Sequence, residues 1–247
     1  GAGRVVGQAH GLGVELTSGQ PVPELLKDGD YCGVRTKDGQ QYRSRALLIA
    51  TGAKYKRLGA EGEEELIGSG VHYCATCDGP FYKGQEIAVI GGGNSAAGGG
   101  LVLTNFASHV TLLVRGDRLK ASALAVDKLK EQHNMDIRYN TEVVGLKGSP
   151  KLQDVLVRDR TNGKVGVLEP KPAGVFVFIG LTTNSGFLPA EIKQDAQGLV
   201  LTWQTLTTSV SGVFAQGDVR AGSTKQPEPP ARQEASRAAR CRTYVPS

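Results

Sequence analysis

The sequence contains no long apolar segment. None of its hydrophobic runs approaches the ~18 uninterrupted apolar residues that a membrane-spanning helix needs, so we expect no membrane partner. No apolar run follows the opening residues Gly1-Ala2-Gly3-Arg4, and no secretory signal peptide is predicted. The first residue is not Met, which indicates that the chain begins inside a longer gene product.

Cysteine is scarce as well, with four residues in a chain of 247. So few cysteines in so long a chain exclude the disulfide scaffold of a small secreted protein. The sequence therefore favours a cytoplasmic protein that is held together by a hydrophobic core.

A concentrated basic surface is also missing. The formal net charge is +5 and the pI is near 9.0, but the basic residues are scattered apart from four arginines between residues 232 and 242. A nucleic-acid-binding module would show a basic stripe with aromatic residues between the cations. We interpret the positive charge as ordinary solvated surface and expect no nucleic-acid partner.

Glycine, by contrast, is abundant: 34 of 247 residues, about twice the usual share. The glycines follow no three-residue period, which excludes a collagen-like helix. The length allows one large domain or two small ones, with enough chain to bury a core.

The first part of the chain predicts strands. Residues 31–36 and 41–45 predict a hairpin around the turn Asp38-Gly39. The apolar run at 46–50 predicts a strand that is buried on both faces. The polar, glycine-punctuated stretch from 54 to 69 that follows predicts a connection between domains.

A second unit begins after that connection. Residues 87–90, 95–106 and 110–114 predict strand, helix and strand, the βαβ unit of a parallel sheet. A further buried strand is predicted at 175–179. Mixed helices and strands of this kind indicate an α/β protein with two subdomains.

The most specific chemical pattern is Cys74-Ala75-Thr76-Cys77-Asp78-Gly79. Two cysteines separated by two residues can close a small disulfide ring, and a carboxyl group beside a dithiol can transfer the proton when a thiolate leaves. A zinc site would need a second Cys or His pair at ligand spacing, and a c-type haem would need His in place of Asp78. Neither requirement is met, so we expect no metal.

The second pattern is Gly91-Gly92-Gly93-Asn94-Ser95-Ala96, a G-x-G-x-x-A sequence between a predicted strand and a predicted helix. In a dinucleotide site Gly91 permits the tight turn, Gly93 lets the backbone approach the pyrophosphate, and Ala96 allows close helix–strand packing. After the next strand the sequence has Arg115, and Lys120 lies close by. Cations at this position suit the 2′-phosphate of NADP better than the ribose hydroxyls of NAD.

The third pattern consists of two strand ends with small, tight turns. Gly217-Asp218 follows the apolar run at 213–215, and Thr51-Gly52 follows the run at 46–50. Each alone is weak, because Gly-Asp is a common turn. Together they predict a place where backbone and an acidic side chain approach a cofactor.

Taken together, these patterns resemble the low-molecular-weight thioredoxin reductases, a group of flavin-dependent pyridine nucleotide-disulfide oxidoreductases. The resemblance rests on Cys74–Tyr82 (CATCDGPFY), Gly91–Ala97 (GGGNSAA) and Gly217–Arg220 (GDVR), with support from Ala50–Ala53 and Phe178–Gly180. It extends from about residue 31 to residue 226.

The resemblance implies a two-domain FAD/NAD(P)-binding fold in which the FAD domain is incomplete. Residues 1–53 and 181–247 would be two segments of a partial FAD domain, and 54–180 an NADPH-binding domain that carries the redox-active cysteines. Cys77 would face the flavin, Cys74 would attack the partner's disulfide, and Asp78 would be the acid/base. Electrons would pass from NADPH through FAD and the dithiol to a thioredoxin-like protein, and the chain would form a homodimer.

The implied cofactor ligands fall into two sets. The FAD set is Thr51, Gly52, Gly217, Asp218 and Gln226. The NADPH set is Gly91, Gly93, Asn94, Ser95, Arg115, Lys120 and Gly180.

The sequence departs from the family pattern in several places. No buried strand followed by G-x-G-x-x-G precedes Ala50, so the unit that holds the FAD pyrophosphate is not found. Gly98-Gly99-Gly100 interrupts the first NADPH helix, which we expect to fray because each glycine costs about 1 kcal/mol relative to alanine. Three prolines between 227 and 230 block a helix from starting before about Ala231.

Two alternative functions remain open from the sequence. One is a truncated, FAD-poor relative that acts as an NADPH-binding or non-enzymatic module. The other is the flavoprotein reductase of a peroxiredoxin system.

Overall fold

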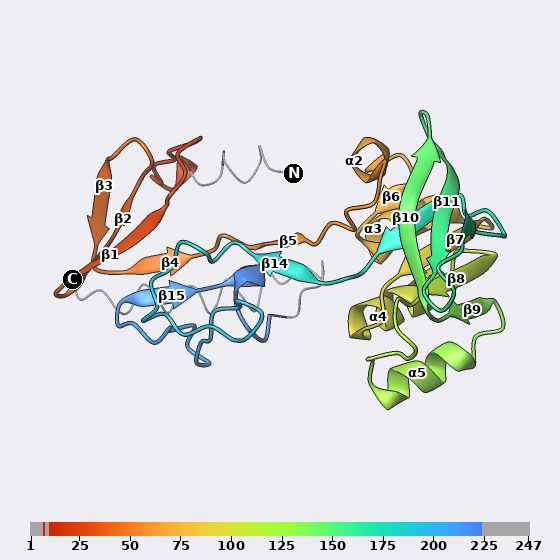
Figure 1. The fold of residues 1–247 in the computed structure, drawn as a ribbon. Helices are drawn as coiled ribbons and strands as arrows, with labels where there is room; N and C mark the ends of the chain where they lie inside the picture. Colours follow the sequence, from red (N-terminus) through yellow and green to blue (C-terminus); the bar gives the residue numbers. More distant parts are fainter. Residues whose placement is uncertain (1–6, 8–9, 224–247) are drawn as a thin grey trace. The chain divides into compact units, whose positions relative to one another are not determined.

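The computed structural model describes residue 7 and residues 10–223, so Gln226 lies outside the described residues (Figure 1). The chain forms two compact units. One contains Tyr55–Leu181, and the other joins the residues up to Lys54 with those from Thr182 onward. These limits differ by one residue from the junctions expected from the sequence.

The unit Tyr55–Leu181 is built on a five-stranded parallel sheet with the strand order β6-β13-β7-β8-β9. In chain order, the strands are β6 (Val71–His72), β7 (Glu86–Ile90), β8 (His109–Leu113), β9 (Met135–Arg138) and β13 (Gly174–Val177). The central strands β7 and β13 are almost entirely buried, as expected when both faces of a parallel sheet are covered.

Two helices cover one face of this sheet. They are α4 (Asn94–Leu103) and α5 (Ala123–Lys130). Apolar side chains from both helices pack in one core cluster with side chains of β7 and β8, such as Val89 and Leu112. The predicted βαβ unit is therefore present, and α4 is continuous through its three glycines instead of fraying.

An antiparallel sheet covers the opposite face. It consists of β10 (Thr141–Gly148), β11 (Leu152–Asp159) and β12 (Val165–Val167). Leu146 and Val155 from this sheet share a second core cluster with Ile90 and Val177 of the parallel sheet. The parallel sheet is thus enclosed between helices and a β-sheet, and its strand ends remain at the edge.

Three short helical segments complete this unit. They are α2 (Glu63–Leu66), α3 (Ala75–Asp78) and the 3₁₀ turn η1 (Gly79–Tyr82). The helix α3 follows β6 after two residues, so the sheet fixes the position of the segment that contains the two cysteines.

The other unit contains the predicted hairpin as part of a three-stranded antiparallel sheet. The strands are β1 (Glu24–Asp28), β2 (Tyr31–Arg35) and β3 (Gln41–Ser44). A parallel pair, β4 (Leu47–Ile49) and β15 (Val213–Ala215), lies in the same unit, and the 3₁₀ turn η2 (Gly217–Val219) follows β15. Two further short strands, β5 (Ala53–Tyr55) and β14 (Leu181–Thr183), pair where the chain passes between the units.

The expectation that the run at 46–50 is buried on both faces is wrong. Ile49 is buried, but Leu48 is 44% exposed. The reason is that β4 has β15 as its sheet partner within the described residues, so the face that carries Leu48 is left uncovered there.

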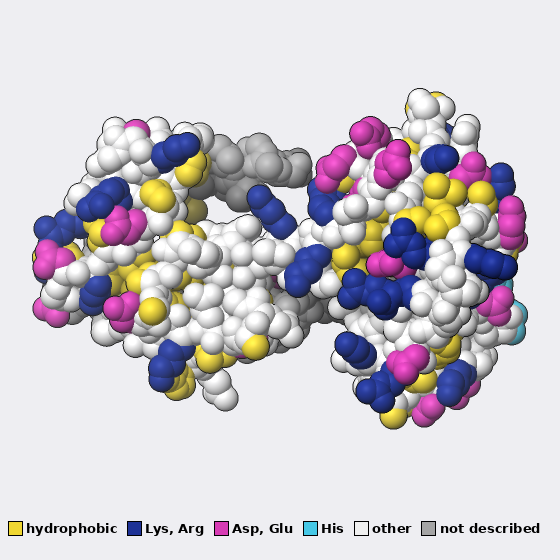
Figure 2. All heavy atoms as spheres, viewed as in Figure 1, with side chains coloured by type: hydrophobic (Ala, Val, Ile, Leu, Met, Phe, Trp, Pro, Cys, Tyr) yellow, Lys and Arg dark blue, Asp and Glu magenta, His cyan; other side chains and the backbone are white. Residues whose placement is uncertain are grey.

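Surface charge is mixed on both units. In the face of each unit seen in Figure 2, basic and acidic side chains are interspersed, and acidic side chains gather at α2, where Glu64 and Glu65 are exposed. Among the described helices none is long and apolar enough to cross a membrane.

Candidate active site

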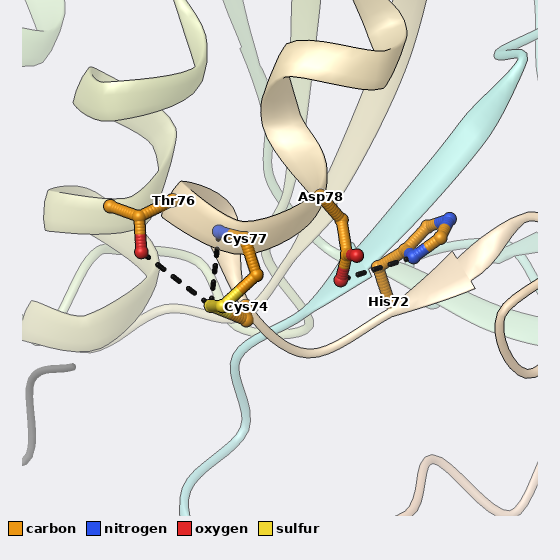
Figure 3. Close-up of a disulfide and its surroundings, with 5 residues drawn as sticks. All are labelled: His72, Cys74, Thr76, Cys77 and Asp78. Carbon is orange, nitrogen blue, oxygen red and sulfur yellow. Dashed lines mark hydrogen bonds and ion pairs between the residues drawn. A yellow bond between two sulfur atoms is a disulfide. The ribbon is translucent and has the colours of Figure 1, made fainter. Parts of the chain in front are cut away.

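The site begins with a disulfide between Cys74 and Cys77 at the start of α3 (Figure 3). Cys74 occupies the N-cap position, and the backbone N–H of Cys77 donates to Cys74 Sγ at 3.2 Å. The hydroxyl of Thr76 lies 3.5 Å from the same sulfur. Because both polar groups contact Cys74, a thiolate formed on reduction would be stabilised at Cys74.

The carboxyl group of Asp78 lies at the other end of α3. Its Oδ2 atom is 3.2 Å from Nδ1 of His72, and Figure 3 shows the two side chains joined in this way beside the disulfide. Within the part of the chain that the structure describes, no hydrogen bond joins this carboxyl group to either sulfur. The contact with His72 uses Oδ2 and leaves Oδ1 outside the pair.

His72 and Tyr82 belong to the site although the sequence patterns did not indicate them. His72 is buried, and its Nε2 atom lies 2.6 Å from the hydroxyl of Tyr82. Burial raises the pKa of Tyr82, and the negative charge of Asp78 raises it further. The available clue was a polar residue in the short buried strand Val71–His72, two positions before Cys74.

The glycine turn before α4 has the geometry of a dinucleotide-binding loop. Gly91 has φ +146, and a Cβ there would lie 2.3 Å from the carbonyl oxygen of Phe178. Around Gly93 nothing lies within 4 Å of the corresponding position, so the backbone is open to an approaching group. Gly93 is the N-cap of α4 and the cap has no side-chain hydrogen bond, which leaves the first-turn N–H groups available to a phosphate.

The cationic segment after β8 is tied to this turn. The backbone N–H of Lys120 donates to the Gly92 carbonyl at 2.6 Å, and the N–H of Ser122 donates to Asn94 Oδ1 at 2.8 Å. The side chains of Arg115 and Lys120 lie in this segment, and Arg115 is exposed. A nucleotide whose pyrophosphate lies at the start of α4 therefore has cations within the neighbouring segment, and the residues present fit NADPH.

The two strand ends predicted as cofactor contacts are neighbours in the other unit. Because β4 and β15 are parallel, with Ile49 paired to Ala215, both chains leave the sheet at the same edge. Gly52 and Gly217 have φ +68 and +75, and nothing lies within 4 Å of a Cβ at either residue. Asp218 is exposed beside them. These open turns and this carboxylate fit a hydroxyl-bearing part of FAD.

Three remaining predicted residues are placed differently. Ser95 is exposed in the first turn of α4. Thr51 donates from its hydroxyl to the carbonyl of Asn184 at 2.7 Å, which links the β4 turn to the returning chain. The carbonyl of Gly180 accepts from the N–H of Lys56 at 3.0 Å, which holds the end of the β13 segment against the chain that follows β5.

Metal chemistry finds no support in the described part of the chain. No group of three or more His, Cys, Asp or Glu side chains within the described residues could hold a metal ion. The chemistry of the site therefore centres on the cysteine pair and on the turn that fits a dinucleotide.

The sequence matches the pyridine nucleotide-disulphide oxidoreductase family over residues 5–239. The chain belongs to this family. The closed Cys-x-x-Cys pair and the nucleotide-binding turn in one unit agree with the membership.

Thioredoxin reductases are among its relatives. The chain is 35% identical to the thioredoxin reductase of Treponema pallidum over 219 residues, which cover 89% of this chain and 70% of that protein. A thioredoxin reductase structure from Giardia duodenalis, 29% identical, superposes with a TM-score of 0.85 and covers 98% of this chain and 79% of that one. The chain is thus a member of the low-molecular-weight thioredoxin reductase group.

The alkyl hydroperoxide reductase of Escherichia coli also has a similar component. That polypeptide is 35% identical over 217 residues, which cover 86% of this chain and 41% of the relative. The thioredoxin reductase of Treponema pallidum is matched over a much larger share of its length, which favours the thioredoxin reductase interpretation.

Proposed function

We propose that this chain is an NADPH-dependent disulfide reductase of the thioredoxin reductase type. Electrons pass from NADPH through FAD to the Cys74–Cys77 pair and then to the disulfide of a thioredoxin-like protein. The observation that carries the proposal is the closed disulfide on α3, in the same unit as the glycine turn and the cationic segment around Lys120. The proposal includes a cytoplasmic location and a homodimer.

When bound, NADPH and FAD supply the two electrons that reduce the cysteine pair. In the reduced chain, Cys74 Sγ attacks one sulfur of the partner's disulfide. A mixed disulfide forms as the partner's own S–S bond breaks, and the leaving thiolate takes a proton. Cys77 Sγ then attacks Cys74 Sγ, which re-forms the Cys74–Cys77 bond and releases the second partner thiolate.

The hydrogen bonds at Cys74 support its role as the attacking residue. The Cys77 N–H and the Thr76 hydroxyl both contact Cys74 Sγ, and a nearby donor favours the thiolate, which is the nucleophile. Asp78 is the proposed acid/base that transfers the proton between thiol groups.

The NADPH-binding residues follow from the turn before α4. Gly91 and Gly93 shape the turn, Asn94 and Ser95 begin the helix, and Arg115 and Lys120 pair with the 2′-phosphate. In the other unit, Thr51, Gly52, Gly217 and Asp218 are proposed to contact FAD.

The test is reduction of a thioredoxin-like disulfide by NADPH, with the chain purified in the presence of FAD. We expect a yellow protein whose flavin absorbance is bleached by NADPH. Cys74→Ser and Cys77→Ser are expected to abolish disulfide reduction and to leave reduction of the flavin by NADPH intact. Cys32→Ser is the matched control, because Cys32 is a free, buried cysteine in the other unit.

Other outcomes would contradict the proposal. A colourless preparation that takes up no FAD would support the FAD-poor, non-enzymatic alternative. Full activity of the Cys74→Ser and Cys77→Ser variants would remove the pair from the reaction. Sedimentation at the mass of a single chain would contradict the homodimer.

A further inference from the structure

His72 occupies a position that the reaction as described does not use. It lies on β6 with 8% of its surface exposed, and its ring is stacked against that of Phe176 with the centroids 5.3 Å apart. Its two nitrogens face different polar groups: Nδ1 faces Asp78 at 3.2 Å, and Nε2 faces the Tyr82 hydroxyl at 2.6 Å. A buried ring held on its face and at both nitrogens has one defined orientation.

The partners also decide where the ring carries its proton. A carboxylate attracts a proton on Nδ1 and repels a lone pair there. Nε2 then accepts from Tyr82, whose hydroxyl keeps its proton because burial raises its pKa. The chain of contacts runs Tyr82 to His72 to Asp78 and ends at the carboxyl group next to the redox pair in sequence.

We propose that His72 is a positioning residue, which holds Asp78 by Oδ2 so that Oδ1 transfers the proton of thiol–disulfide exchange. The inference rests on the proposed acid/base function of Asp78. In the step, the Cys74 S–H bond breaks and its proton goes to Asp78 as the sulfur electron pair forms the bond to the partner. The partner's S–S bond breaks, and its leaving thiolate takes that proton from Asp78. Two electrons leave the dithiol with the substrate, and no further reactant is needed.

Two substitutions separate this role from simple packing. His72→Asn retains an N–H group close to the position of Nδ1 but loses the ring that stacks on Phe176. His72→Phe retains a stacked ring and loses the N–H group. A positioning role predicts that the Asn variant reacts and the Phe variant does not, whereas a packing role predicts the reverse.

The reaction is measured with the full chain after reduction by dithiothreitol and desalting, without NADPH or FAD. Two small disulfides are compared. Glutathione disulfide releases a basic thiolate that needs a proton, whereas 5,5′-dithiobis(2-nitrobenzoate) releases a stable thiolate that leaves without one. The second disulfide thus reports whether the thiol itself is intact.

We expect His72→Phe to lower the rate with glutathione disulfide by about 10² and to lower the rate with the nitrobenzoate by much less. His72→Asn should react within about threefold of the unsubstituted chain with both. Tyr82→Phe keeps its ring and loses the hydroxyl, so it should show an intermediate loss with glutathione disulfide, and it serves if His72→Phe does not fold.

Equal losses for both disulfides, or equal losses for the Asn and Phe variants, would overturn the role of His72 alone. A reduced, unsubstituted chain that reacts with neither disulfide would overturn the proposed function together with this inference. A long-range ¹H–¹⁵N spectrum gives an independent result: we expect the His72 proton on Nδ1, and a neutral ring with its proton on Nε2 would contradict the proposal.

Discussion

At the scale of single residues, Glu63 shows how the segment before the disulfide is held. Its side chain is buried, and its oxygens accept from the N–H groups of Leu58 and Gly59 and from the hydroxyl of Tyr73. A buried carboxylate without such donors would be strongly destabilising. Since Tyr73 immediately precedes Cys74, this cluster anchors the chain at the redox pair.

Tyr73 gives a stability prediction at alkaline pH. Burial raises the pKa of Tyr73 to about 12, with a further contribution from its hydrogen bond with Glu63. An unfolded tyrosine ionises near a pKa of about 10, so the unfolded chain loses this proton first and the free energy of unfolding falls as the pH rises from about 10 to 12.

In Tyr73→Phe we expect a smaller fall over that interval, measured by urea unfolding at about pH 9 and pH 11. Between about pH 7 and pH 9 Tyr73 keeps its proton whether the chain is folded or unfolded, so the difference in stability between the two proteins should stay constant there. An identical alkaline fall in both proteins would contradict the assignment to Tyr73.

Arg115 gives a prediction about cofactor choice. Its exposed side chain follows β8 in the segment tied to the glycine turn. Arg115→Ala should weaken NADPH binding about tenfold, the effect of losing one charge-assisted contact, and leave NADH binding unchanged because NADH has no 2′-phosphate.

Binding is followed by titration of the nicotinamide fluorescence. Arg45→Ala, which removes an exposed cation from the other unit, is the control for net charge and should behave like the unsubstituted chain. Equal weakening of NADPH and NADH would place Arg115 outside the 2′-phosphate site.

At the scale of elements, α4 shows why the three glycines are tolerated. A Cβ at Gly99 would lie 2.4 Å from the ring of Phe178, so the absence of a side chain there permits close packing of the helix against the end of β13. At Gly98, which is exposed, nothing lies within 4 Å of a Cβ. The glycines are therefore not equivalent: one is needed for packing, and its neighbour only lowers helix propensity.

The two positions predict opposite effects of the same substitution. Gly98→Ala should raise the free energy of unfolding by about 0.5–1 kcal/mol, because alanine restricts the unfolded chain and favours the helix. Gly99→Ala should lower it, because Phe178 has to move away from the core that it packs against. Both are measured by urea unfolding, and a Gly99→Ala chain as stable as Gly98→Ala would contradict the packing argument.

At the scale of the whole molecule, the two compact units have separate cores. The unit Tyr55–Leu181 contains two apolar clusters on either side of its parallel sheet, and the other unit contains a third cluster around Ile49 and Val213. Because each unit has a core of its own, we expect each to unfold in its own transition.

Calorimetry with each cofactor tests this prediction. NADPH at about 100 times its dissociation constant should stabilise the unit that contains the glycine turn by about 2.7 kcal/mol and raise only that transition. FAD should raise the other one. A single transition that shifts as a whole with either cofactor would show that the units unfold together.

Local sequence patterns predicted much of this molecule. The hairpin at 31–45, the βαβ unit and the Cys74–Cys77 pair each depend on residues close together in the chain, and the family resemblance connected them. The exposure of Leu48 and the continuity of α4 were not predicted. Each depends on what packs against the segment, and propensity or hydrophobicity within one segment does not contain that information.

The sequence by itself determined the chemistry that is available: a dithiol followed by an acid, a glycine turn with cations after the next strand, and two tight strand ends. Only the tertiary structure decided which groups meet. The contact between Asp78 and His72 and that between His72 and Tyr82 exist because β6 joins the edge of the parallel sheet next to β13, where the His72 ring meets Phe176. Side chains that meet through a sheet leave no fixed spacing in the sequence, and for that reason the partner of the acid had to be found in the fold.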